Sequence, residues 1–139
     1  MILINPTGKG IRSDGYGDGH YKARRRRANG SRYTHKGTDY ICQVGQSVYA
    51  PVDAKYVRIA YPYSNSREYT GMYFEAEFFN YKLLYVKPTI KPGKVKQGQI
   101  VGFAQNIGNR YNVDFRKKMV PHVHFEITEV DPEFLMGMK

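Results

Sequence analysis

Two short polar motifs, far apart in the chain, constrain the fold most, because one site built from both requires the chain to bring them together. The first is His35-Lys-Gly-Thr-Asp39 and the second is His122-Val-His124, and they hold three of the four histidines. Residues two apart on a strand point the same way, so His122 and His124 would face one site. His35 and Asp39 can add ligands from a turn that runs into a strand. Two imidazoles, one carboxylate and a water molecule make a catalytic zinc site, and the spare histidine is then free for proton transfer.

Simpler interpretations of these residues exist. A pair of the form H-x-H also occurs as a surface or core histidine pair, and H-x-x-x-D alone is less specific still. Glu126 shares the strand face of the histidines and either orients a ligand or is an exposed charge at a strand end. Cys42 is the one cysteine, so no internal disulfide can form, and it is either a zinc ligand or a lone buried thiol. The two motifs together, in a chain so poor in histidine, favour metal binding over chance.

The apolar pattern predicts a sheet structure. The chain has 139 residues, which is enough for one domain with a real core. Tyrosine-rich, β-branched stretches from Thr38 onward favour strands over helices, so we predict an all-β fold with a mainly antiparallel sheet and long loops. On the last strand Val123, Phe125 and Ile127 are expected to pack in the core. The predicted strands are Asp39–Cys42, Ser47–Ala50, Ala54–Tyr61, Met72–Phe79, Tyr81–Lys87, Ile100–Gln105 and Val120–Thr128, with a turn near Asn80 and a short turn or helix from Asp131.

The N-terminal region has a different composition. Residues 5–37 are rich in Gly, Ser, Asn, Asp and Arg and show little periodicity, which indicates an extended arm and long loop lying over the sheet. We therefore predict an arm, residues 1–30, packed on a single domain, residues 31–139. No signal peptide is visible, so we expect synthesis in the cytoplasm, and no stretch of the sequence reaches transmembrane length.

The formal net charge of +10 predicts attraction to a polyanion, such as nucleic acid, an acidic membrane face or an anionic bacterial wall. The densest cluster is Arg24, Arg25, Arg26 and Arg27. It is either a substrate-binding or polyanion-binding surface or a solvated loop that aids solubility. No recognised nucleic-acid motif is present, so we rank specific nucleic-acid binding last.

Four motifs occur in a recognisable order. They are His35-Lys-Gly-Thr-Asp39, Val48-Tyr-Ala-Pro51, Lys96-Gln-Gly-Gln-Ile-Val-Gly102 and Pro121-His-Val-His-Phe-Glu126. In this order, over roughly Gly30 to Thr128, the chain resembles the lysostaphin/LytM-type zinc endopeptidases. The Gly-Asp-Gly-His-Tyr-Lys-Ala-Arg-Arg stretch of the arm resembles small phage or prophage members, and the chemotaxin-like branch is a further relative.

The resemblance implies a lysostaphin-type peptidase fold, a duplicated hybrid motif, with one zinc ion bound by His35, Asp39 and His124. It implies that His122 is the catalytic histidine beside the metal. The expected activity is hydrolysis of peptide cross-links in bacterial peptidoglycan, and the expected partner is that wall or another anionic wall polymer. The protein would act at the cell envelope after phage delivery or lysis, or as a virion component.

One position departs from the family pattern. Active members commonly carry a second catalytic histidine in a Tyr-x-His-Leu strand, where this chain has Tyr85-Val-Lys87-Pro88. Lys87 is therefore a candidate catalytic residue: its ammonium can donate to an oxyanion, but it is a poor general base unless its pKa is strongly depressed. The alternative function is a catalytically impaired, zinc-containing module that binds the wall or belongs to a virion.

Overall fold

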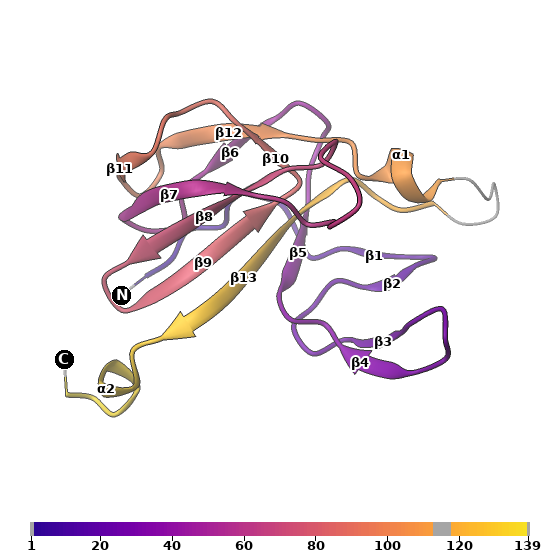
Figure 1. Cartoon of the computed structure of the whole chain (residues 1–139), viewed down its shortest axis with the longest axis horizontal. Helices are drawn as coiled ribbons and strands as arrows, with labels where there is room; N and C mark the ends of the chain where they lie inside the picture. The colour runs from indigo at the N-terminus through magenta and orange to yellow at the C-terminus, as the bar shows by residue number, and fades with distance from the viewer. Residues whose placement is uncertain (1, 113–117, 139) are drawn as a thin grey trace.

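The largest part of the fold is a six-stranded, fully antiparallel sheet (Figure 1), in a computed structural model that describes residues 2–112 and 118–138. Its strand order is β11-β7-β8-β9-β13-β5, so the first and last motifs of the sequence meet at one edge. The strands are β5 (Thr38–Ile41), β7 (Ala54–Ala60), β8 (Gly71–Ala76), β9 (Phe79–Leu84), β11 (Gly93–Val95) and β13 (His122–Val130).

A smaller sheet completes the core. It has the order β10-β12-β6, from β6 (Ser47–Tyr49), β10 (Val86–Pro88) and β12 (Ile100–Ala104), and lies beside β7 and β8 in Figure 1. Apolar side chains of both sheets form one buried cluster, because each sheet turns alternate residues inward. The fully buried members of this cluster are Val48, Ala50, Met72, Phe74, Tyr81, Leu83, Val86, Val101 and Val123.

The arm forms short strands instead of an unstructured loop. Two small hairpins, β1 (Ser13–Asp14) with β2 (Gly17–Asp18) and β3 (Arg24–Arg26) with β4 (Arg32–Thr34), lie beside β5 (Figure 1). The turn of the second hairpin contains residue 30, so β3 from the arm pairs with β4 from the following segment. Hydrogen bonds from Arg12 N to Asp39 O (2.9 Å) and from Asp39 N to Gly19 O (2.8 Å) tie the arm to β5.

Two short helices complete the described part of the chain. They are α1 (Gly108–Tyr111) and α2 (Pro132–Leu135). The second helix begins at Pro132 as the sequence predicts, and the Asp131 side chain accepts a hydrogen bond from Glu133 N at its start. Neither helix has the length or the apolar composition that crossing a membrane requires.

The predicted all-β antiparallel fold is confirmed, with local differences. The turn between β8 and β9 lies at residues 77–78 instead of near Asn80, because Phe79 is itself buried and starts the inward alternation of β9. The predicted strand Tyr81–Lys87 divides at Tyr85, where the chain leaves the large sheet for the small one. Ile127 was expected in the core but is 42 % exposed, because β13 extends beyond its last pair with β5, at Phe125.

Candidate metal centre

Antiparallel pairing of β5 with β13 brings the two polar motifs into contact. His124 is the cross-strand partner of Asp39, and His122 is the partner of Ile41. His35 lies in the turn before β5. Three side-chain atoms converge: His124 Nδ1 lies 2.9 Å from Asp39 Oδ1, His35 Nε2 lies 3.3 Å from the same oxygen, and the two nitrogens are 3.1 Å apart.

This donor set fits a zinc ion. Zinc binds imidazole nitrogen and carboxylate oxygen at about 2.0–2.1 Å in tetrahedral geometry, which separates neighbouring ligand atoms by about 3.3 Å. The three measured separations of 2.9–3.3 Å are near that value. His35, Asp39 and His124 therefore form a group that can hold one metal ion, with a fourth position left for a water molecule or substrate.

The outer nitrogen of each ligand histidine is also occupied. His35 Nδ1 lies 3.1 Å from the carbonyl oxygen of His20, and His124 Nε2 lies 3.0 Å from Glu126 Oε1. Both partners are acceptors, so each outer nitrogen carries a proton, and each inner nitrogen can offer its lone pair to a metal once any proton that it shares with Asp39 is displaced. Glu126 makes the contact that an orienting carboxylate makes.

His122 lies beside this group and is oriented in the same way. Its Nδ1 donates to the carbonyl oxygen of Val120 at 2.8 Å, so its Nε2 keeps a lone pair and points toward Asp39, 3.7 Å from Oδ2. Burial lowers the pKa of His122, although Asp39 and the Val120 carbonyl oppose that shift. The ring is therefore neutral at neutral pH and can accept a proton.

The metal-binding side chains shift the pKa values of one another. Burial alone would raise the pKa of Asp39, but hydrogen bonds from His124 and His35 hold it well below its usual range. Burial likewise opposes the charged form of His124, yet its hydrogen bonds to Asp39 and Glu126 raise its pKa to about 8. Without a metal the group is thus held together by a shared proton, which a cation must displace on binding.

Arg12 is a member of the site that the sequence did not reveal. Its Nε and Nη2 each lie 3.2 Å from Asp39 Oδ2, and its Nη1 lies 2.7 Å from Asp14 Oδ1. Only 3 % of the residue is exposed. It therefore binds the carboxylate oxygen that faces away from the ligand nitrogens and fixes the orientation of Asp39. An arginine in a polar arm carries no periodic signal that could have linked it to Asp39.

A cavity of about 330 Å³ opens over the group. Arginine and tyrosine side chains form its walls, and the hydroxyl of Tyr63 links Tyr111 at 2.7 Å and Tyr85 at 3.4 Å behind them. The residues that line the cavity are Arg12, Tyr16, Arg25, Arg26, Tyr33, His35, Asp39, Leu84, Tyr85, Tyr111, Met119, His122 and His124.

Lys87 is not among the residues that line this cavity. It is exposed on β10, where it pairs with Phe103. Tyr85 instead lies against His122, edge to face with 5.3 Å between ring centroids. Tyr85 has a φ of 67°, which few side chains adopt; hydrogen bonds from Tyr85 N and Val86 N to Thr70 O hold this turn. The structure therefore places a phenol beside His122 and leaves Lys87 outside.

The predicted arginine cluster separates into different environments. Arg25 and Arg26 line the metal cavity, while Arg24, Arg25 and Arg26 line a second cavity beside it. Arg27 lies with its guanidinium 4.3 Å from the ring centroid of Tyr33. Cys42 is buried and is not part of the metal-binding group.

Comparisons with known proteins agree with this geometry. Residues 33–134 match the model of peptidase family M23. Leukocyte cell-derived chemotaxin-2 of Bos taurus is 33% identical over 104 residues, which are 73% of this chain and 66%, just under two thirds, of that protein.

Two solved structures share the fold. A zinc-containing peptidase from Vibrio cholerae aligns with a TM-score of 0.60 and 21% identity, over 100% of this chain and 40% of its own. The catalytic domain of lysostaphin from Staphylococcus simulans aligns with a TM-score of 0.54 and 23% identity, over 91% and 92% of the two chains. The lysostaphin-like fold, the family match and the order of its motifs agree, and the chain belongs to peptidase family M23.

Proposed function

We propose that the protein is a zinc-dependent endopeptidase that cleaves peptide cross-links of bacterial peptidoglycan. The observation that carries the proposal is the orientation of three histidine rings around Asp39. The outer nitrogens of His35 and His124 bond to acceptors, which turns both inner nitrogens toward Asp39 Oδ1, and the Val120 carbonyl holds His122 with its Nε2 toward the same carboxylate. A surface or core histidine pair that binds no metal does not require this arrangement.

His35, Asp39 and His124 would hold the zinc ion. Zinc supplies Lewis acidity, which lowers the pKa of a water molecule toward neutrality and polarises a peptide carbonyl. His122 Nε2 accepts the proton of the attacking water and later donates it to the leaving amine nitrogen. The Val120 carbonyl holds the His122 ring in position through both transfers, and Arg12 and Glu126 keep the Asp39 and His124 side chains aligned.

The substrate, the delivery route and the origin are parts of the same proposal. A net charge of +10 favours contact with an anionic wall, where local concentration of the enzyme would rise. We propose that the protein acts at the cell envelope after phage delivery or lysis, or as a virion component. The catalytic domain of the antimicrobial peptidase lysostaphin shares the fold, which supports a wall substrate.

A second function has a specific observation in its favour. Among the residues that line the described cavity, the histidines are His35, His122 and His124, so no further imidazole accompanies His122, and Lys87 lies outside. A protein with this site would retain zinc and wall binding if hydrolysis were lost. The second proposal is thus a zinc-containing wall-binding or virion structural module.

Muropeptide release from purified peptidoglycan of several cross-bridge types separates the two functions. The zinc-loaded protein is compared with His122→Ala, with a chelator-treated sample, and with His20→Ala as the matched control. His20 is exposed and contributes only its backbone carbonyl to the site, so its substitution should leave release intact. Release that requires zinc and His122 supports the endopeptidase. Wall binding without release, with zinc bound, refutes it in favour of the binding module.

A further inference from the structure

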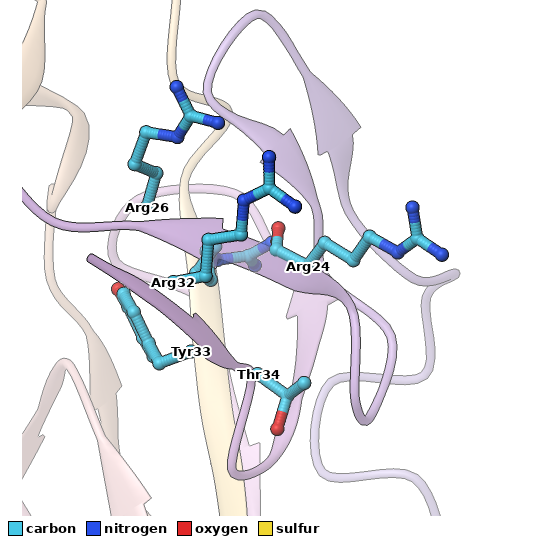
Figure 2. A pocket seen from close by; sticks show the side chains of 6 residues that line it. Arg24, Arg26, Arg32, Tyr33 and Thr34 are labelled. Atoms are coloured by element: carbon cyan, nitrogen blue, oxygen red, sulfur yellow. The ribbon is translucent and has the colours of Figure 1, made fainter. Parts of the chain in front are cut away.

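The β3–β4 hairpin carries three arginines on one face. Residues two apart on a strand share a face, and Arg26 is the direct cross-strand partner of Arg32, as Arg24 is of Thr34. Arg24, Arg26 and Arg32 therefore share one face of the hairpin, and Arg25 and Tyr33 lie on the opposite face. Figure 2 shows the guanidinium groups of Arg26 and Arg32 extending to the same side of the hairpin.

These three guanidinium groups have no acidic partner within the described part of the chain. Arg25, by contrast, lies 4.0 Å from Asp39 Oδ2. Like charges placed directly opposite each other destabilise a hairpin, so the pair Arg26 and Arg32 carries a cost in the free protein. A bound anion would remove that cost and gain charge-assisted hydrogen bonds.

The arginine face borders a cavity that adjoins the metal centre. The cavity has a volume of about 660 Å³ and is lined by Arg24, Arg25, Arg26, Arg32, Tyr33 and Thr34. It shares Arg25, Arg26 and Tyr33 with the cavity over the metal-binding group, and Thr34 directly precedes His35. The two cavities therefore adjoin along these three shared residues.

The distance along β4 between Arg32 and His35 determines where an anionic group would lie on a bound peptide. A strand rises about 3.3 Å per residue, so Arg32 lies about 10 Å along β4 from His35. A substrate peptide in extended form covers the same distance in about three residues. The anionic group would thus lie about two to three residues from the bond placed at the metal.

We propose that the β3–β4 hairpin is a carboxylate-binding subsite that selects acidic peptides for the adjacent metal centre. The proposal rests on the peptidase function and names its substrate class. Guanidinium groups bind carboxylates with two parallel hydrogen bonds, and the shared wall places that carboxylate on the peptide being cut. A phosphate of a wall polymer carries similar charge, but it is not part of the peptide being cut, so its distance from the metal centre is not determined.

Binding of a peptide that cannot be cut tests the subsite without hydrolysis. The probe is a fluorescently labelled muropeptide monomer with free stem carboxylates, compared with the same monomer after its carboxylates are converted to amides. Fluorescence anisotropy with zinc-loaded protein should show roughly tenfold tighter binding of the free acid. The double variant Arg26→Gln and Arg32→Gln should abolish that preference.

Two other arginines provide the matched control. Arg58 lies over the ring of Tyr73 and Arg67 over the ring of Tyr61, and neither lines the two cavities. The double variant Arg58→Gln and Arg67→Gln removes the same charge and should keep the preference. If both double variants lose the preference for the free acid equally, the effect is one of net charge and the subsite is overturned. Equal binding of the acid and the amide by the native protein would also overturn it.

Cleavage of cross-linked muropeptides separates the subsite from the peptidase function. Amidation of the substrate, or the Arg26 and Arg32 double variant, should raise KM with little change in kcat. Cleavage with equal kcat/KM for acid and amide overturns the subsite and leaves the peptidase. Preferential binding of the acid without any cleavage supports the subsite and overturns the peptidase. Competition by a glycerol-phosphate polymer, with no effect of amidation, assigns the arginines to phosphate and refutes the proposal.

Discussion

Gly37 is the residue whose enlargement should damage the metal centre most directly. It is buried between two ligands of the same motif, His35 and Asp39. A Cβ atom at this position would lie 2.3 Å from the backbone oxygen of Phe125 and 2.8 Å from Cε1 and Nε2 of His124. Ordinary contacts begin at 3.4 Å, so the β5 end must move away from β13 by about 1 Å, a shift of the kind that overpacking forces on backbone.

The magnitude follows from the tolerance of metal coordination. Zinc–ligand distances are specified to about ±0.2 Å, so a displacement of about 1 Å separates His35 and Asp39 from His124 well beyond it. We expect Gly37→Ala to lower zinc affinity at least about 10- to 100-fold, the scale seen when ligand-orienting contacts are lost. Overpacking should also lower the free energy of unfolding of the metal-free protein by about 1–3 kcal/mol.

Competition with a chromophoric zinc chelator measures the affinity, and denaturant unfolding with and without zinc measures the stability. Gly10→Ala is the control, because a Cβ there meets nothing within 4 Å and the residue does not have a positive φ. If the zinc affinity of Gly37→Ala lies within about twofold of the Gly10→Ala value, the reasoning is refuted. Zinc–ligand distances tolerate changes of only about ±0.2 Å, so a backbone shift of about 1 Å must weaken binding.

Two further predictions concern buried polar groups. Arg12→Met should destabilise the metal-free protein by about 3–5 kcal/mol in denaturant unfolding, because it removes the guanidinium that pairs with the buried carboxylates of Asp14 and Asp39; a change below about 1 kcal/mol would show that solvent replaces the guanidinium. Burial raises the pKa of Cys42 to about 11 from 9.0, so at pH 8 its thiol should react with an aromatic disulfide about 100-fold more slowly in the native protein than in denaturant. The same shift keeps the proton on the folded protein, so its contribution to stability is present below pH 9 and declines toward pH 11; equal native and denatured reaction rates would contradict the burial.

The strands of the central region follow from local chemistry. Phe79, Tyr81 and Leu83 alternate with polar residues, and alternation of this kind defines a strand with one buried face. The hairpins of the arm carry no such signal. Their strands have two or three residues, mostly charged or glycine, so pairing partners and not apolar patterning hold them in place.

The sequence by itself indicated which residues are candidates to bind a metal, because imidazole and carboxylate donors are chemically distinctive and their spacing on a strand predicts the face they share. The resemblance to the family then selected His35, Asp39 and His124 among them. The sequence could not determine what surrounds them. The burial of Arg12 against Asp39 depends on a contact between segments far apart in the chain. The phenol beside His122 depends on a positive φ at Tyr85 that tertiary hydrogen bonds impose against the preference of the residue. Only the folded chain, in which sheet register and loop path are satisfied together, decides that Tyr85 lies in the cavity and Lys87 outside it.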